Sequence, residues 1–526
     1  MKRNDNLPLN IKERRNARTS LLASVGVLAV LILLFNQLDY RLIRKPAQDA
    51  RKKAEITRQK KENEENTPVT SIASVIAVGD NLYHQSLIDA GESDSGDWNY
   101  DKIYTHVLDA IQSADVKMID QETVFTTDHD SVSSYPSFAT PTEVGDAIIK
   151  AGFNVVESAT NHIDDFGYDF LADTLNFWKT KYPDVTLIGI HDSQEDADTV
   201  KIREVNGIKI AFLDYTYGTN VGGIEGRDYM IDIFDKTKIT TMIKKAKEQA
   251  DCIIFVAHWG TEDETMPSEY EKQWAAYLME QGVNVIIGGH PHVLQPYGRL
   301  SDDKGNEAVV FYSLGNFVST QQKLEELLGG MASFTIQKSE LNGKTSIQIL
   351  TPEVKPLVMH YNSDSGEFGP YMLEDYTEEL AAQNGVRNYI GDVFTLANLK
   401  SKYNEIMSMN VTPSTGTDLL DVTIDTDLNM IDSSGNIVED NDSVTAEQYY
   451  AQKGVDINSE DSSDSSSGES SYDDSSSDDS SYDDGSYDDG SDDSSYDDSS
   501  YDDYSDDSSY DDSSYDSSDD GSYDEE

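Results

Sequence analysis

Polar and ionisable side chains follow five apolar segments of strand length between residues 71 and 292. Acids, an asparagine and histidines stand at these places: Asp80, Glu122, the pair Asn161 and His162, His258, and the pair His290 and His292. Carboxylates are hard oxygen donors, and imidazole suits zinc, copper, iron and nickel. A carboxylate can also bridge two ions about 3.5–4 Å apart, as in two-metal hydrolytic sites. The residue types therefore predict a metal site.

Each of these segments, taken alone, has an ordinary structural interpretation. An acid after Gly79 is typical of a turn, an asparagine such as Asn161 often forms a local cap, and His258 fits a buried interior position. The sequence GGHPH over residues 288–292 is more specific, because two histidines that flank a proline seldom serve packing. We expect its glycines to let the backbone turn tightly, so that both imidazoles face one point. Together the five segments favour a site.

Alternating strands and helices would position these side chains. Apolar runs predict strands over residues 71–78, 116–119, 153–156, 208–214, 252–257, 283–287 and 308–313. Helical spacing predicts helices over residues 100–113, 142–150, 170–179, 236–248 and 270–281. This alternation predicts an α/β fold with central sheets. In open α/β sheets ligands bind at the carboxyl ends of strands, which is where the polar residues lie.

The order of the motifs resembles the CapA family of poly-γ-glutamate capsule biosynthesis proteins, which are relatives of calcineurin-like metallophosphoesterases. The resemblance covers about residues 71–321 and rests on these motifs: GD at 79–80, ET at 122–123, AGFNVV at 151–156, NH at 161–162, DFG at 165–167, HWG at 258–260, GHPH at 289–292 and YSLGNF at 312–317. It implies a metallophosphoesterase-like sandwich of β-sheets flanked by helices.

The resemblance also implies roles for individual residues. His162 falls on the histidine that donates a proton to the leaving group or steadies the transition-state charge. The predicted metal ligands are Asp80, Glu122, Asn161, His258, His290 and His292. The cofactor implied is a divalent metal such as Mn, Zn or Fe. Leu82 stands where the phosphoesterases have the histidine of an Asp-x-His motif, and Glu122 stands where they usually have Asp, so the alternatives are one ion or a weakened pair.

Residues 21–38 form an apolar run that no charge interrupts. A membrane-spanning helix needs about 20 such residues, with about 17 as the lower limit. A buried core helix fits poorly, because the run is apolar on every side and has dense Lys and Arg at both ends. A cleaved signal peptide fits less well than an uncleaved anchor, because no A-x-A site follows the run. Basic residues lie on both sides of it, so the positive-inside rule gives a near tie. We expect residues 1–20 inside the cell and the C-terminal domain outside.

The predicted organisation has six parts. A cytoplasmic segment (1–20), a transmembrane anchor (21–38) and a charged stalk (39–70) precede a CapA-like domain (71–340), a C-terminal extension (341–458) and a tail (459–526). The tail consists of 28 acids, 27 Ser, 9 Tyr and 4 Gly. It has no aliphatic side chain with which to build a core, so we expect disorder. The simpler interpretation of the tail is a solvated, self-repelling brush. The functional interpretation is a polyanion that collects cations or basic wall-bound partners.

Charge and cysteine content exclude several classes. The net charge is −59, and residues 1–458 still hold 71 acids against 40 bases. Such a chain lacks the basic surface that a nucleic-acid-binding protein needs. The single cysteine, Cys252, excludes an intramolecular disulfide and a thiolate zinc cluster, and its place in an apolar run predicts a buried side chain.

Two classes of function remain. The resemblance implies a membrane-anchored, extracellular component of poly-γ-glutamate synthesis or export. Its partners would be a polymer-synthesis membrane complex and an anionic polymer or cell-wall component. The ligand set instead favours a surface metal-dependent hydrolase of a phosphoester or of an amide bond in a polymer. A pure adhesion or display protein would explain the stalk and tail but not the histidines.

Overall fold

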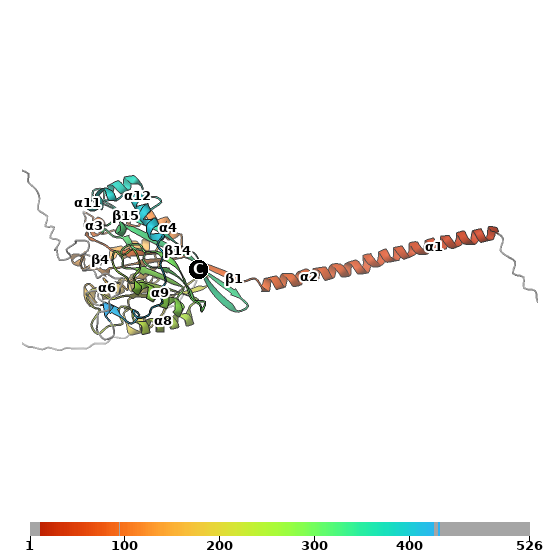
Figure 1. The fold of residues 1–526 in the computed structure, drawn as a ribbon, viewed down its shortest axis with the longest axis horizontal. Helices are drawn as coiled ribbons and strands as arrows, with labels where there is room; N and C mark the ends of the chain where they lie inside the picture. Colours follow the sequence, from red (N-terminus) through yellow and green to blue (C-terminus); the bar gives the residue numbers. More distant parts are fainter. Residues whose placement is uncertain (1–10, 94, 425–429, 432–526) are drawn as a thin grey trace, which may run out of the picture. The chain divides into compact units, whose positions relative to one another are not determined.

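The structure is a computed structural model that describes residues 11–93, 95–424 and 430–431 (Figure 1). The chain divides into two units, Met1–Ser459 and Glu460–Glu526. The second unit lies outside the described residues, and so does the predicted disorder of residues 459–526.

The first described segment is helical from end to end. It contains α1 (Ile11–Asp39), a π-helical turn η1 (Tyr40–Arg44) and α2 (Lys45–Glu65). Within it, Arg14–Lys61 is the one described helix that is long and apolar enough to cross a membrane, and its most apolar part is exposed throughout. The apolar side chains of residues 21–38 thus enter no core formed by the described part of the chain.

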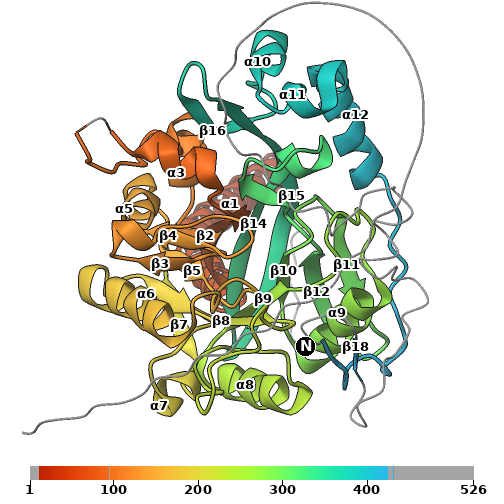
Figure 2. The same cartoon turned by 90° about the vertical axis from the view of Figure 1, so that its left-hand side faces the viewer.

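A sheet of eight strands forms the first layer of the folded domain (Figure 2). Four strands run parallel: β1 (Val69–Asn81), β2 (Val116–Asp120), β5 (Val155–Glu157) and β6 (Thr186–Ile188). The antiparallel strands β14 (Leu328–Leu341), β15 (Lys344–Asn362) and β16 (Glu367–Met372) extend the sheet beyond β1, and short β13 (Asn316–Val318) pairs in parallel with β1. The sheet therefore continues into the segment that the sequence analysis assigned to a C-terminal extension.

A second sheet of six strands has the order β11-β12-β10-β9-β8-β7. Its central strands β8 (Ile208–Thr216), β9 (Cys252–His258), β10 (Val285–Gly289) and β12 (Glu307–Phe311) are parallel. The edge strands β7 (Lys201–Val205) and β11 (Tyr297–Ser301) are antiparallel to their neighbours. The site-bearing strands of both sheets are thus parallel ones.

The two sheets pack face to face, as the alternation of side chains along β9 shows. Ile254 and Val256 join the core that contains Val75 of β1. Ile253 and Phe255 belong to the core formed with the helices α8 (Lys236–Gln249) and α9 (Glu269–Gln281). Successive side chains of a strand point to opposite faces, so β9 is buried on both faces. The predicted α/β sandwich of sheets flanked by helices is therefore confirmed.

The helices lie around these sheets. They are α3 (Gln85–Gly91), α4 (Leu108–Gln112), α5 (Thr142–Ala151), α6 (Gly167–Lys181), α7 (Gln194–Ala197), α8 (Lys236–Gln249), α9 (Glu269–Gln281), α10 (Glu378–Gln383), α11 (Arg387–Ile390) and α12 (Leu396–Met407). The helix predicted over residues 100–113 is shorter, with a 3-10 turn η2 (Thr105–Val107) before α4. Tyr100 and Tyr104 are buried there, so the chain follows the core rather than a regular helix.

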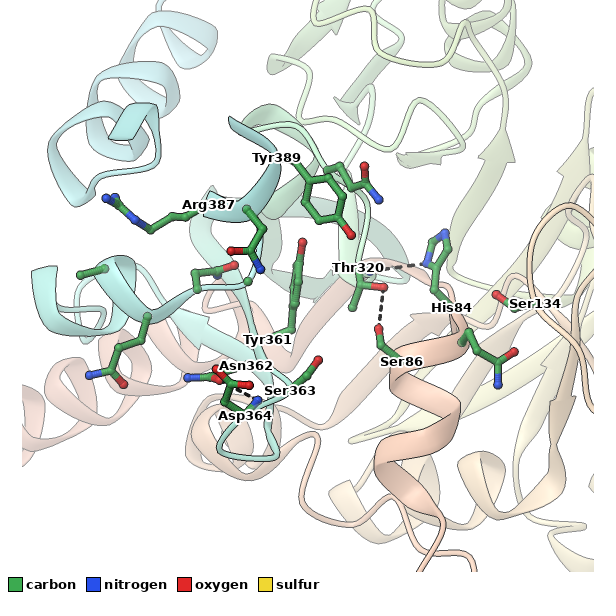
Figure 3. A pocket seen from close by; sticks show the side chains of 17 residues that line it. His84, Ser86, Ser134, Thr320, Tyr361, Asn362, Ser363, Asp364, Arg387 and Tyr389 are labelled. Carbon is green, nitrogen blue, oxygen red and sulfur yellow. Dashed lines mark hydrogen bonds between the residues drawn. The ribbon is translucent and has the colours of Figure 1, made fainter. Parts of the chain in front are cut away.

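Short elements complete the described chain. They are β3 (Val124–Thr126), η3 (His129–Ser131), β4 (Ala139–Pro141), η4 (Glu325–Leu327), η5 (Gly391–Val393), β17 (Thr423–Ile424) and β18 (Met430–Ile431). A pocket of about 730 Å³ lies between the loop that follows β1 and the segment that carries α10 and α11 (Figure 3).

Candidate metal centre

The ends of four parallel strands meet where the two sheets approach each other. In the first sheet Asp80 of β1 lies opposite Asp120 of β2, and in the second His258 of β9 lies opposite Gly289 of β10. The backbone N–H of His290 lies 3.4 Å from Asp80 Oδ1 and so links the sheets. All seven predicted site residues are buried here, with at most 8% of any of them exposed: Asp80, Glu122, Asn161, His162, His258, His290 and His292.

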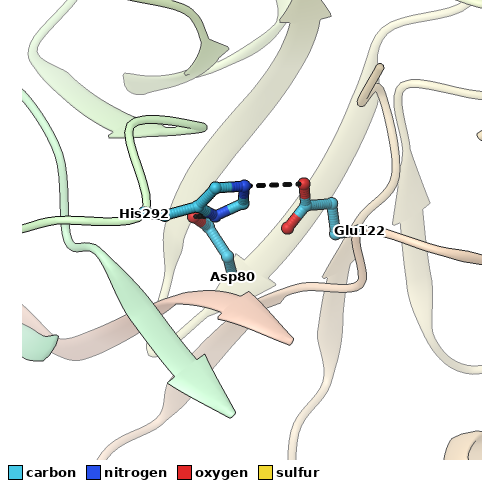
Figure 4. A group of neighbouring side chains, drawn as sticks. All are labelled: Asp80, Glu122 and His292. Atoms are coloured by element: carbon cyan, nitrogen blue, oxygen red, sulfur yellow. Dashed lines mark hydrogen bonds and ion pairs between the residues drawn. The ribbon is translucent and has the colours of Figure 1, made fainter. Parts of the chain in front are cut away.

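Five of the predicted residues form a connected group. Asp80 Oδ2 lies 2.9 Å from His292 Nδ1, and Glu122 Oε1 lies 3.7 Å from His292 Nε2 (Figure 4). His258 Nε2 lies 3.9 Å from Glu122 Oε1 and 2.8 Å from Asn161 Oδ1. One ligand atom from each of Asp80, Glu122 and His292 falls within 4.8 Å of the others. Glu122 Oε1 thus lies near both His258 and His292, and this is the position that a carboxylate bridging two ions would occupy.

Asp120 belongs to the same place, although the sequence analysis did not select it. Its Oδ2 lies 3.2 Å from His258 Nδ1, and Asp80, Asp120 and His258 make a second group whose ligand atoms lie within 4.8 Å. The predicted strand over residues 116–119 stops just before Asp120, and Glu122 was selected as the site residue after that strand. The spacing of Asp120 to Glu122 was a usable signal, because side chains two apart in an extended segment share a face.

His290 lies beside these groups rather than within them. Its ring centroid is 5.0 Å from that of His258 and 4.6 Å from that of Tyr217. Its Nδ1 is buried and has no hydrogen-bond partner among the described residues. The structure therefore brings His290 to the centre through its backbone N–H, which faces Asp80. Its imidazole has no hydrogen bond or ion pair with a carboxylate among the described residues.

The glycines of GGHPH act differently from the expectation. Gly288 and Gly289 end β10 in extended conformation, whereas His290 and His292 themselves have positive φ angles of 94° and 58°. A Cβ on Gly289 would lie 2.8 Å from Asp80 Oδ1 and 2.9 Å from an oxygen of Asp120. The glycine thus permits a close approach of the two sheets, and the histidines hold the turn at the cost of backbone strain.

The carboxylates of the centre lack partners for a full negative charge. Both oxygens of Glu122 and Oδ1 of Asp120 are buried without a hydrogen bond from the described residues. Burial raises the pKa of Glu122 to about 7, and burial together with the neighbouring Asp80 raises the pKa of Asp120 well above its ordinary value. Buried acids of this kind either take up a proton or pair with a cation, and a bound metal ion would supply that cation.

The imidazoles differ in their electrostatic environment. Burial lowers the pKa of His258 to about 4 and that of His290 well below its ordinary value. At His292 burial also disfavours the charged form, but Glu122 and Asp80 outweigh it and raise the pKa well above the ordinary value. Neutral imidazoles beside unpartnered carboxylates are the donor set that a divalent transition metal prefers, so the residues present fit such an ion.

His162 stands at the edge of this centre with partners of its own. Its Nδ1 lies 2.8 Å from Asp165 Oδ2 and 3.1 Å from Asn220 Nδ2, and its ring packs edge-on against Phe138. Burial disfavours the imidazolium, but the hydrogen bond to Asp165 outweighs it and raises the pKa of His162. An oriented histidine of raised pKa is suited to donating a proton.

Comparison with known proteins shows that this domain is similar to bacterial capsule synthesis proteins. The family model described as "Bacterial capsule synthesis protein PGA_cap" matches residues 74–321, which carry every site residue named above. The domain belongs to this family. The chain is 31% identical over 180 residues to "Capsule biosynthesis protein CapA" of Bacillus anthracis and 34% identical over 171 residues to "PGA biosynthesis protein CapA" of Bacillus subtilis (strain 168). These matches cover 33% and 32% of the chain but only 42% and 43% of the two relatives.

The capsule synthesis domain also has weak structural likenesses. A putative 5'-nucleotidase from Staphylococcus aureus in complex with alpha-ketoglutarate has a TM-score of 0.36 and 14% identity, and the match covers 54% of each chain. A phosphatase from Mycoplasma pneumoniae has a TM-score of 0.30 and 14% identity, covering 54% of this chain and 95% of the other.

Proposed function

We propose that the chain is a membrane-anchored component of the synthesis or export of a capsule polymer, poly-γ-glutamate, and that its domain works outside the cell. The family match and the two relatives named for capsule biosynthesis support the process. The exposed apolar helix supports the anchor. A strain that lacks this chain should carry less cell-bound polyglutamate, measured as glutamate released by acid hydrolysis of the washed capsule, and normal amounts would overturn the proposal.

A divalent metal would be held by the six predicted ligands, with Asp120 beside them. The observation that carries this is the set of unpartnered buried oxygens on Glu122 and Asp120, next to the neutral His258. A bound ion would act as a Lewis acid that polarises a phosphoryl or carbonyl oxygen. Asp80 and Glu122 would bind the ion, and His292, which lies near both, would have to lose its proton before it could bind as well.

Metal analysis of the full-length protein, purified in detergent, tests this site. We expect one or two equivalents of Mn, Zn or Fe after purification under metal-replete conditions. The double variant His290→Ala and His292→Ala should lose the metal and keep the fold, judged by circular dichroism. His84→Ala is the matched control, because this histidine lies outside both ligand groups. Full metal content in the double variant would show that the ion binds elsewhere.

The second candidate is a metal-dependent hydrolase of a phosphoester or of a polymer amide bond. The pair of His162 and Asp165 favours it, since a purely structural site needs no oriented proton donor. We expect His162→Gln to keep its metal and to lose about 10²–10⁴-fold in hydrolysis of a p-nitrophenyl phosphodiester, the range for general acid catalysis. The hydrolase candidate would be contradicted if the native protein held metal but hydrolysed neither this ester nor polyglutamate. That result would favour a capsule component that does not hydrolyse these bonds.

A further inference from the structure

The pocket of about 730 Å³ lies outside the metal centre and has no role in the function proposed above. Residues from four distant parts of the chain line it: the loop and helix after β1, Ser134 in the loop before β4, the loop after β13, and the segment from the end of β15 to α11. Its volume falls in the range of small-molecule sites, about 300–1,000 Å³. A ligand bound there would contact both the capsule synthesis domain and the segment beyond it.

Two tyrosines, Tyr361 and Tyr389, line the pocket (Figure 3). Tyr389 is 61% exposed, so its ring is open to a ligand in the pocket. Tyr361 is 6% exposed, and its buried hydroxyl has no hydrogen-bond partner among the described residues. Buried tyrosine hydroxyls usually have a partner. The pocket thus offers an aromatic face and an unused hydroxyl side by side.

The remaining lining is polar and close to neutral. The amide side chains of Gln322, Gln383 and Asn388 are exposed, and no hydrogen bond within the described chain occupies them. Arg387 is the one lysine or arginine among the described lining residues, and it is bound to Asp392 and, at 2.9 Å, to the carbonyl of Phe394. Figure 3 shows its guanidinium directed away from Thr320 and His84. A polyanion would find no free cation in this lining.

The pocket reaches toward the metal centre through two rings. His84 lines it and accepts a hydrogen bond from the backbone of Thr320, 3.4 Å away. The His84 ring packs edge-on against Phe138 at 5.4 Å, and Phe138 packs edge-on against His162 at 4.8 Å. One phenyl ring therefore separates the pocket wall from the predicted proton donor.

We propose that this pocket binds a neutral oligosaccharide, with a sugar ring on Tyr389 and sugar hydroxyls on Tyr361 and the surrounding amides. A pyranose has an apolar C–H face that suits an aromatic ring, and its rim of hydroxyls suits hydroxyl and amide partners. An extended glutamate polymer fits less well, because each residue adds a negative charge to a lining whose only arginine is already paired.

Calorimetric titration of the full-length protein tests the proposal, in a detergent without a sugar headgroup. The probes are cellotetraose and chitotetraose, with tetraglutamate and tetraalanine as controls. We expect saturable binding of at least one saccharide and none of either peptide. Tyr389→Ala should weaken binding at least tenfold, and Tyr361→Phe should weaken it about fivefold, the equivalent of one hydrogen bond. Tyr168→Ala, a partly exposed tyrosine on α6, is the matched control and should bind like the native protein.

Binding of neither saccharide would overturn the proposal, and so would saccharide binding that both tyrosine variants retain. Stronger binding of tetraglutamate would also overturn it and would assign the pocket to the acidic polymer. The variant His290→Ala with His292→Ala separates this proposal from that of the metal centre. It should bind the saccharide normally even when it has lost its metal, and a joint loss would place the ligand on the metal instead.

Discussion

Asp120 ends β2 with its carboxylate directed at Nδ1 of His258, while Nε2 of the same ring faces Asn161 and Glu122. A carboxylate that accepts the Nδ1 proton fixes the tautomer and leaves Nε2 free for a metal. Asp120→Asn should therefore weaken metal affinity about 10–100-fold, the usual cost of losing such a partner. Competition with a chromophoric chelator measures it.

Asp109→Asn is the control for this change, since Asp109 is an exposed acid of α4. An unchanged affinity in Asp120→Asn would show that His258 is oriented by other contacts. A complete loss of metal, with the fold intact, would instead make Asp120 a direct ligand, which its place in the group with Asp80 and His258 also permits.

At the scale of the structural elements, Gly289 at the end of β10 lies against the ends of β1 and β2. A methyl group there would lie within 2.9 Å of oxygens of both Asp80 and Asp120, so one of these carboxylates must move. Gly289→Ala should destabilise the protein by about 1–3 kcal/mol, as overpacking does, and should lower its metal content. Gly298→Ala in β11 should change neither, because a Cβ there meets no atom within 4 Å. Thermal unfolding and metal analysis report the two effects separately.

His191 and Asp232 link the edge strand β6 of the first sheet to β8 of the second sheet. His191 follows β6, its Nε2 lies 2.8 Å from Asp232, and the carbonyl of Asp232 accepts a hydrogen bond from Thr216 of β8. Burial lowers the pKa of His191, but Asp196 and Asp232 outweigh burial and raise it. A raised folded-state pKa stabilises the fold most below the unfolded pKa of about 6.5, and the contribution is lost as the pH rises through the folded pKa.

His191→Asn should therefore cost about 2 kcal/mol at pH 5.5, the value of a charged hydrogen bond, and less at pH 9. Urea unfolding at the two pH values measures this difference. His129→Asn is the control, because the His129 side chain is 40% exposed and its ion pair with Glu143 lies at the surface. Equal losses for His191→Asn at both pH values would mean that the imidazole is neutral in the folded protein.

How much of this could be predicted from the sequence depends on distance along the chain. The strands before Asp80 and His258 could be predicted from their apolar runs, because a strand that is buried on both faces consists mostly of apolar residues. The partners of His191 and the neighbours of Tyr361 come from parts of the chain that local patterns do not connect. Asp120 was missed for a related reason: its role depends on His258, which lies 138 residues away.

At the scale of the whole molecule, the helix Arg14–Lys61 should keep the protein in the membrane. We expect the full-length chain to stay with membranes through a sodium carbonate wash. The double variant Val30→Arg with Leu34→Arg should be released, since each arginine near the centre of a span costs about 2.5–3.5 kcal/mol. Ile56→Arg in α2 is the control outside the apolar run, and it should stay bound. Retention of the double variant would place the attachment elsewhere in the chain.

The left-handed backbone at His290 and His292 affects which residues evolution favours at these two positions. Glycine adopts such angles without the penalty that a side chain brings, so glycine at either place would relax the turn. Selection for folding alone would thus favour drift away from histidine at both positions. A lineage in which the imidazoles had lost their use would be free to make that exchange and gain stability. We infer that comparing relatives at these two positions separates chains that still use the rings from those that only inherited the fold.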